Sequence, residues 1–488
     1  RTMPRPLPFP FRSTAALLGA GLLLAGCASI QPPPAPQLAG LPAAWSGTTQ
    51  TADPNAARAA LLTWWRQFDD PLLTELVTTA LDANTGVASA RAALRQARAL
   101  QDVAAAGLGP TVSGSADVQR SRASNSTANR FAAGLDASWE LDLFGANRSA
   151  RDAAAASTQA SAASLGDVQV SLAAEVALAY LSLRSGQARL AIAEANLAAQ
   201  DETLQITRWR LQAGLADGLA AEQAQAAAAQ TRAALPPLRT AIAQAGHALA
   251  VLTGQPPAAL DARLATAAPL PQPAATLALA GPADTLRQRP DVRAAEWKLA
   301  AEWATLAQAD AALKPSFRLS GSLGLSALTL GGLTSGGAVA ASLLGVVTLP
   351  VFDGGALRGR QQAQQAVLDQ AQQAWRASVL AALQEVEDAL VALRNDRDRA
   401  QRLQTAATAA ANAATLASQR WRSGLVDFQT VLDTQRSQLS AQDSLASASA
   451  DLAADHVRLY KALGGGWADA DAKVSGGWAD DPQTASAP

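Results

Sequence analysis

The sequence predicts an α+β membrane protein that is built twice from long helices and a hairpin of strands. Three observations support this prediction: two long stretches without proline, two pairs of segments in which apolar and polar residues alternate, and one motif that recurs about 210 residues later. The chain has 488 residues, of which 49% are hydrophobic and only 16% are charged. This length allows one very long domain or several ordinary ones.

Long helices are expected where proline is missing. No proline occurs from residue 111 to 235 or from 351 to 481, and a proline inside a helix costs ~3 kcal/mol. Apolar residues at three- and four-residue spacing predict one helix from residue 146 to about 212, which would be ~100 Å long. Such alanine-rich helices favour close packing against neighbouring helices in a coiled-coil-like assembly.

Strand hairpins are expected in front of each long helix. In the first hairpin, residues 111–119 and 131–143 alternate between apolar and polar types, and the polar residues 120–129 are expected to form a loop. In the second hairpin, residues 316–325 alternate clearly and 339–349 more weakly. A half-buried sheet on a soluble core would show the same period. Strands of about ten residues with carboxylates on one face instead favour a membrane barrel with a watery lumen.

Four strands cannot close a barrel, and open strand edges are not tolerated in lipid. The chain is therefore expected to oligomerise. Two copies would give eight strands with a filled interior, whereas three copies would give twelve strands and room for a passage. The strand pattern alone leaves both numbers open.

The two halves of the chain repeat each other. Arg210-Leu-Gln-Ala-Gly-Leu-Ala-Asp217 matches Arg420-Trp-Arg-Ser-Gly-Leu-Val-Asp427, and the strand segments before them recur at a similar offset. This pattern indicates an internal duplication. The predicted organisation is a signal peptide (1–26), a proline-rich lipid-anchored segment (27–61), a first repeat (62–254), a proline-rich linker (255–283), a second repeat (284–464) and a C-terminal tail (465–488).

The N-terminus carries the features of an export signal. A short positive region precedes an apolar run of about ten residues, which is too short to span a bilayer. The run ends in Leu-Ala-Gly before Cys27, which resembles a bacterial lipobox, so Cys27 is the predicted site of lipid attachment. No acidic residue follows Cys27 directly, which favours transfer to the outer membrane. The alternative is an ordinary secretory signal in which Cys27 is incidental.

Charge and residue counts exclude several classes of function. The 39 basic and 40 acidic residues give a net charge of −1, so the chain lacks the electrostatic footprint of a nucleic-acid-binding protein. Two histidines and one cysteine exclude a zinc site built from His and Cys, and an intrachain disulfide. The carboxylates at Glu385, Glu387 and Asp388 have no third group to support acid–base chemistry. We therefore expect no catalytic residue, no bound metal and no cofactor.

Six short motifs occur in a fixed order along nearly the whole mature chain. They are Trp64–Leu72, Trp139–Gly145, Leu286–Val292, Leu349–Gly355, Glu385–Leu390 and Lys461–Trp467. Each motif alone is weak, and the ordered set is specific. From about residue 42 to 467 this set resembles the outer-membrane efflux proteins, a TolC/OprM-like family, and in particular its lipoprotein branch of outer-membrane factors for RND-type pumps.

The resemblance implies a TolC-like homotrimer in the outer membrane of a Gram-negative bacterium. Each chain would give four strands to a twelve-stranded β-barrel, and its long helices would continue the barrel through the periplasm. The resemblance further implies an equatorial position for the linker (255–283). The implied function is the exit duct of a tripartite efflux pump, with a periplasmic adaptor and an inner-membrane pump as partners and no enzymatic activity. Two alternatives remain: the outer-membrane component of a type I protein secretion system, and a non-conducting periplasmic coiled-coil lipoprotein.

The resemblance also places a gate at the helix turns. The turns at Gly214 and Gly424 would form the periplasmic tip, where glycine permits a tight reversal. In the family, acidic rings narrow this entrance, and here they map onto Asp433, with Asp427 nearer the turn. Asp427 and Asp217 have a simpler alternative role as helix N-caps. The family often has Tyr where Trp421 stands, so the resemblance does not determine which aromatic residue makes a gate contact here.

Overall fold

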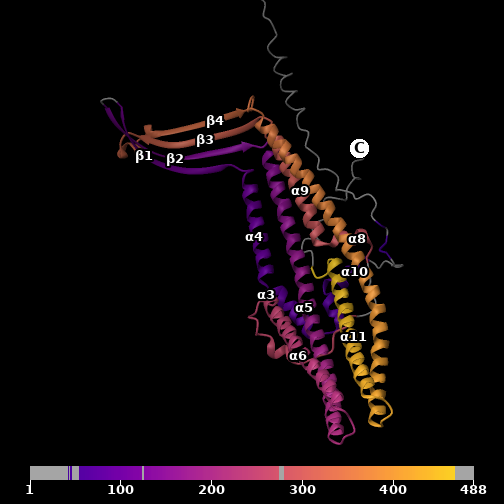
Figure 1. Ribbon diagram of the computed structural model, residues 1–488. Helices are drawn as coiled ribbons and strands as arrows, with labels where there is room; N and C mark the ends of the chain where they lie inside the picture. Colours follow the sequence, from indigo (N-terminus) through magenta and orange to yellow (C-terminus); the bar gives the residue numbers. More distant parts are fainter. Residues whose placement is uncertain (1–41, 43, 47–53, 124–125, 274–279, 468–488) are drawn as a thin grey trace, which may run out of the picture. The chain divides into compact units, whose positions relative to one another are not determined.

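The computed structural model describes residues 42, 44–46, 54–123, 126–273 and 280–467 (Figure 1). The predicted signal peptide, the lipid site Cys27 and residues 468–488 of the predicted tail lie outside the described residues. Helices dominate, and four strands form one sheet.

The first half of the chain leads from short helices through a strand hairpin into a helical hairpin. The absence of proline between residues 111 and 235 allows the long helix that was predicted to start at residue 146. The elements are α2 (Pro54–Leu62), the 3-10 helix η1 (Trp64–Phe68), α3 (Pro71–Ala83), α4 (Thr85–Ala106), β1 (Thr111–Ala123), β2 (Ser126–Leu141), α5 (Ala146–Gln212) and α6 (Gly218–Leu252).

The second half repeats this order. The long helices of the two halves, α5 and α10, each have 67 residues, and the returning helices α6 and α11 each have 35 residues. This equality confirms the internal duplication. The elements are α7 (Asp261–Leu264), α8 (Pro282–Gln288), α9 (Pro290–Ala311), β3 (Ser316–Ala327), η2 (Leu330–Thr334), η3 (Gly336–Ala338), β4 (Val339–Thr348), α10 (Ala356–Arg422) and α11 (Phe428–Ala462).

The chain divides into two compact units. The described part of the first, the sheet unit, comprises residues 96–159 and 297–373. The second, the helical unit, comprises the described residues of 38–95, 160–296 and 374–488. The boundary between the units falls within α4, α5, α9 and α10.

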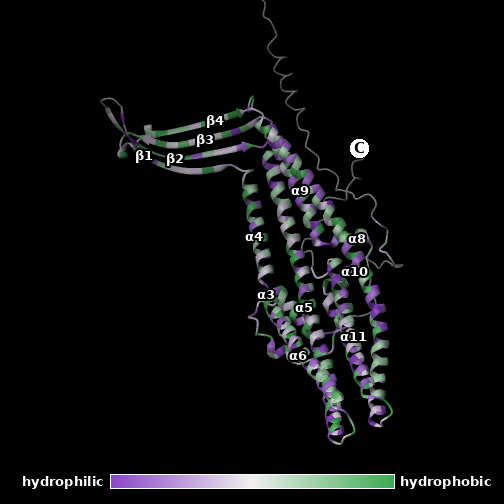
Figure 2. Ribbon diagram, in the orientation of Figure 1, coloured by the Kyte–Doolittle hydropathy of each residue, from purple (hydrophilic) through white to green (hydrophobic). Residues whose placement is uncertain are grey.

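The sheet unit contains an antiparallel sheet in the order β1-β2-β3-β4, and Figure 1 shows these strands side by side. Pairing places Trp139 opposite Leu319 and Leu135 opposite Leu323, so these residues share one face. Figure 2 shows hydrophobic and hydrophilic residues interleaved along the strands. We call this side the apolar face; on β1 to β4 it holds Val112, Gly114, Ala116 and Val118; Phe131, Ala133, Leu135, Ala137, Trp139 and Leu141; Phe317, Leu319, Gly321, Leu323, Leu325 and Ala327; and Val339, Ala341, Leu343, Gly345 and Val347.

The opposite side, the polar face, is defined by side-chain contacts between strands. Arg318 Nη2 lies 3.4 Å from Glu140 Oε2, and the hydroxyls of Ser322 and Ser342 lie 2.7 Å apart. The exceptions are Leu344 and Val346 of β4, which share this face and explain the weak alternation there. A sheet with one apolar and one polar side has the pattern of a membrane barrel wall.

The first hairpin is longer than predicted. The polar residues 120–129 were expected to form a loop, and this expectation is wrong: β1 continues to Ala123 and β2 begins at Ser126. Backbone pairing continues because Arg120 opposite Asn129 and Arg122 opposite Thr127 can form ladder hydrogen bonds without an apolar side chain. The two strands therefore extend past the last pair with β3, Phe131 and Ala327.

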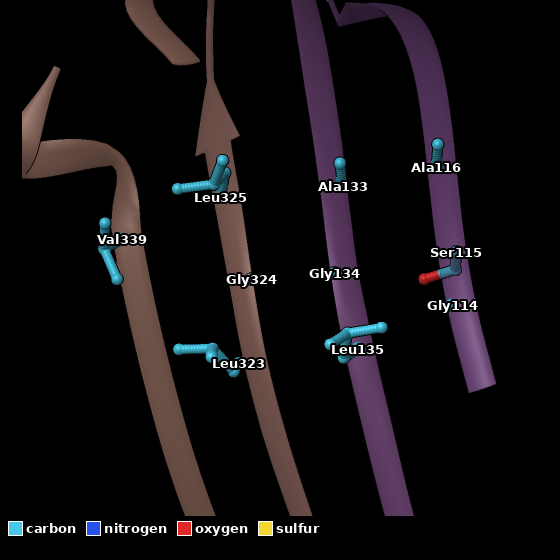
Figure 3. Close-up of a pocket in the computed structure, with 10 residues that line it drawn as sticks. All are labelled: Gly114, Ser115, Ala116, Ala133, Gly134, Leu135, Leu323, Gly324, Leu325 and Val339. Carbon is cyan, nitrogen blue, oxygen red and sulfur yellow. The ribbon is translucent and has the colours of Figure 1, made fainter. Parts of the chain in front are cut away.

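A cross-strand glycine pair brings the middle strands close together. Gly134 on β2 lies opposite Gly324 on β3, and a Cβ at Gly134 would lie only 3.2 Å from the Cα of Gly324. A shallow hollow of about 590 Å³ surrounds this pair, lined mostly by aliphatic side chains such as Leu135, Leu323 and Val339 (Figure 3). Since the hollow is open and almost without polar lining, it carries no chemistry.

The core of the helical unit contains a cluster of aromatic residues among many aliphatic ones. Trp64 stacks on Tyr460 with ring centroids 5.1 Å apart, and it meets Trp65 and Phe68 edge-on. Leu73 of α3 is also buried in this core. The packing joins α11 to η1 and α3, which are distant from it in sequence.

A buried arginine ties the start of the second repeat to two other helices. The Arg289 side chain is 7% exposed and donates hydrogen bonds to Asp291, Glu385 and the carbonyl of Ala462 at 2.7, 2.7 and 2.6 Å. Burial disfavours its charge, but the two carboxylates outweigh this effect and raise the pKa of Arg289. Glu385 is therefore a structural partner of Arg289.

Candidate functional site

The two helix turns have the same backbone geometry. Gly214 has a φ of 72° and Gly424 a φ of 75°. At the first turn the amide of Leu215 donates to the carbonyl of Arg210 at 2.8 Å, which with the Gly214 amide bond forms a Schellman motif. The amide of Leu425 makes the equivalent bond at 2.9 Å. Both glycines thus have the left-handed backbone conformation that this kind of helix end requires.

Two aspartates cap the returning helices. Asp217 accepts a hydrogen bond from the Ala220 amide, and Asp427 accepts one from the Thr430 amide, both at 2.8 Å. Bonds from the side chain and then the backbone of Thr430 lower the pKa of Asp427. The N-cap role of both residues is confirmed.

Asp433 lies on α11 beyond the N-cap, and its carboxylate does not cap a helix as those of Asp217 and Asp427 do. Its side chain is 59% exposed, accepts a 3.1 Å hydrogen bond from Gln429, and lies 3.7 Å from Arg436 Nη1. These partners are on the same helix, so the carboxylate still faces outward from its own chain. Its predicted role in a gate stays a prediction.

The Trp421 side chain is buried at the turn and does not project into solvent. It is 6% exposed and packs against Phe428 with ring centroids 5.6 Å apart. The Arg210 guanidinium lies 4.3 Å from the Trp421 ring centroid and donates to the carbonyls of Trp421 and Arg422 at 3.2 and 3.1 Å. Arg210 thus links the end of α5 to the end of α10.

A second contact crosses between the same helices in the opposite direction. Arg422 Nη2 lies 2.6 Å from Glu202 Oε1, and both side chains are about half exposed. Sequence reasoning missed Arg210, Glu202 and Arg422 as a set. Arg210 opens the first copy of the turn motif, but Arg422 has no counterpart there, because Gln212 stands at the matching position. The partner of each arginine on the other hairpin cannot be read from local spacing.

A polar seam aligns α5 with α11 above the turns. Arg189 makes a bidentate pair with Asp443 at 2.7 and 2.9 Å. Farther along, Asn196 bonds Gln442 at 2.9 Å. The planar fork of an arginine makes the first contact specific for one register.

Other candidate residues fit structural roles. His247 is exposed. His456 is buried, and burial followed by repulsion from Arg397 lowers its pKa to about 4. No group of three His, Cys, Asp or Glu residues arranged to hold a metal ion occurs in the part of the chain that the structure describes.

Known proteins share this sequence and fold. Residues 76–255 and 281–465 match the family model of the outer membrane efflux protein. The toluene efflux pump outer membrane protein TtgF of Pseudomonas putida is 33% identical over 458 residues, covering 91% of this chain and 95% of that protein. The pyoverdine export outer membrane protein OpmQ, also of Pseudomonas putida, is 34% identical over 469 residues, covering 92% of this chain and 97% of that protein.

The solved outer-membrane channel OprN is 36% identical, with a TM-score of 0.81, and the match covers 88% of this chain and 99% of that chain. The predicted TolC-like fold, with four strands from each chain, is confirmed. The chain belongs to the outer membrane efflux protein family.

Proposed function

We propose that the protein is the exit duct of a tripartite efflux pump and passively conducts substrates across the outer membrane. The observation that carries this proposal is the four-stranded sheet, which has an apolar face, a polar face and an unpaired edge on both β1 and β4 among the described residues. A spacer made only of helices needs no such sheet. A barrel wall needs lipid on one side and water on the other.

The duct is a homotrimer. In lipid the edges of β1 and β4 must find partners, and a neighbouring copy offers the complementary edge. Three copies give a twelve-stranded barrel, which is wide enough for an aqueous passage. The polar face, with Glu140, Arg318 and the paired serines, then lines the lumen.

A lipid on Cys27 anchors the chain in the outer membrane, and the helical hairpins extend into the periplasm. The predicted organisation into segments 1–26, 27–61, 62–254, 255–283, 284–464 and 465–488 is retained as part of this proposal. The equal lengths of α5 and α10, and of α6 and α11, support the two repeats within it.

The helix turns at Gly214 and Gly424 form the periplasmic tip, where the adaptor protein and inner-membrane pump dock. Three copies of Asp433 around the axis form a constriction that attracts cations and repels anions. Asp427 and Asp217 contribute less to this ring because their carboxylates already cap helices. Trp421 acts through its contact with Arg210 rather than as a separate aromatic gate.

The duct does no chemistry, and the pump selects the substrates. Relatives are named for toluene efflux and for pyoverdine export, two chemically different cargoes. A shared conduit with different pumps accounts for this range.

The trimer is tested by the mass of the full-length protein purified in detergent. Native mass spectrometry should give a particle of three chains. A particle of one or two chains would contradict the twelve-stranded barrel.

A further inference from the structure

The end of the sheet where both hairpins turn carries only positive charge. Residues 118–131 contain three arginines and no acidic residue, and residues 326–340 contain no charged residue. The whole chain is balanced, with 39 basic and 40 acidic residues. The absence of carboxylates is therefore a local feature of this end, and it favours an anionic partner.

The three arginines lie on different faces. Arg120 and Arg122 lie two and four residues after Val118, so they continue the apolar face of β1. Both are exposed. Arg130 lies on the polar face, and its Nε donates to the hydroxyl of Ser326 at 3.3 Å.

The apolar face ends directly below Arg120. Val118 pairs with Phe131, and these are the last apolar residues of this face on β1 and β2. From Leu141 to Phe131 the strand is about 33 Å long, which gives about 25 Å of height at a barrel tilt of ~40°. This matches the apolar band of an outer-membrane barrel. Arg120 and Arg122 then stand at the level of the lipid headgroups.

We propose that Arg120 and Arg122 bind the phosphate groups of glycolipids in the outer leaflet of the outer membrane. The inference rests on the proposed function, because the apolar face meets lipid only in the closed barrel. A guanidinium binds phosphate oxygens in bidentate geometry and holds its charge at all relevant pH values. Three copies present six such arginines around the barrel. Together they fix the height of the barrel in the membrane and restrict rotation of its upper rim relative to the lipid.

The test uses the full-length protein in detergent and lipid A with two phosphates as the probe. Native mass spectrometry at rising lipid A concentration compares wild type with Arg120→Gln/Arg122→Gln. Arg122→Gln alone and Arg130→Gln form a charge-matched pair on opposite faces. Binding of the double variant should be about tenfold weaker. Arg122→Gln should weaken binding and Arg130→Gln should leave it unchanged.

Lipid A without phosphates checks the chemistry, because the wild type and the double variant should bind it equally weakly. The proposal is overturned if the double variant binds bis-phosphorylated lipid A as wild type does, or if Arg130→Gln loses as much affinity as Arg122→Gln. Conductance of the same preparations separates the two levels. A conducting wild type with phosphate-independent binding contradicts only the lipid assignment, and a wild type that never conducts contradicts the duct and the assignment together.

Discussion

The Arg422 guanidinium at the end of α10 lies 2.6 Å from a Glu202 carboxylate oxygen of α5, while Arg210 of α5 lies over the ring of Trp421 on α10. Each helical hairpin therefore gives one arginine to the other. If the duct opens by separation of its helix turns, both contacts must be broken or moved.

Removing the exposed ion pair between Arg422 and Glu202 should weaken the link between the two helix turns without unfolding the chain. We expect Arg422→Gln to raise the mean conductance of reconstituted channels. An ion pair that is half exposed contributes only about 0.2–1 kcal/mol, so the melting temperature should change little. Arg402→Gln is the matched control, since Arg402 forms its ion pair with Asp398 on its own helix. Equal conductance of both variants would remove Arg422 from the gate.

Asp433 should control charge selectivity rather than stability. Replacing it by Ala removes one carboxylate per copy from the proposed ring, so the preference for cations should fall and the conductance should rise. The reversal potential in a salt gradient measures this preference. Asp427→Ala is the comparison, because its main effect should be the loss of the N-cap bond to the Thr430 amide and a lower melting temperature. A reversal potential that is identical in wild type and Asp433→Ala would rule out the ring.

Burial of His456 should make stability depend on pH. Its pKa is lowered from 6.5 to about 4, first by burial and then by Arg397. The imidazole of His456 therefore binds a proton more readily in the unfolded chain than in the folded one. The stability that the fold gains while His456 is neutral is fully present above pH 6.5 and is lost as the pH falls toward 4. The melting temperature of His456→Gln should therefore change less between these two pH values than the melting temperature of the wild type.

His247→Gln serves as the control for His456, since His247 is exposed and is the other histidine of the chain. It should keep the wild-type pH dependence of the melting temperature. If the melting temperatures of wild type and His456→Gln depended equally on pH, other groups, such as the neighbouring buried Asp455, would control stability between pH 4 and 6.5.

The lipid anchor can be separated from the barrel. Cys27→Ala should abolish incorporation of radiolabelled palmitate, because Cys27 is the only cysteine in the chain. Trimer assembly in detergent should persist, since the proposed barrel contacts lie in the sheet. Continued palmitate labelling of the variant would refute the lipobox prediction.

Local sequence signals predicted most of the fold. The missing prolines and the helical spacing placed the long helix at residues 146 to about 212, and α5 spans Ala146–Gln212. Alternation located the strands, but it failed at residues 120–129 because pairing there depends on backbone hydrogen bonds rather than on an apolar face. Glycine and aspartate spacing likewise predicted both turns and their caps.

The contacts between the turns were not predictable. Arg210 and the Trp421 carbonyl are 211 residues apart in sequence, and they meet because the ends of α5 and α10 lie side by side in the fold. The environment of Asp433 is a further case. Its partners within the chain are Gln429 and Arg436, while a ring of three carboxylates depends on other copies.

The most direct test of the duct is single-channel conductance of the purified full-length protein in a planar bilayer, with the mass of the same preparation determined in parallel. The account predicts small, cation-selective currents from a particle of three chains. A protein that inserts as a trimer but carries no current, or that remains a monomer or dimer without conducting, would contradict it.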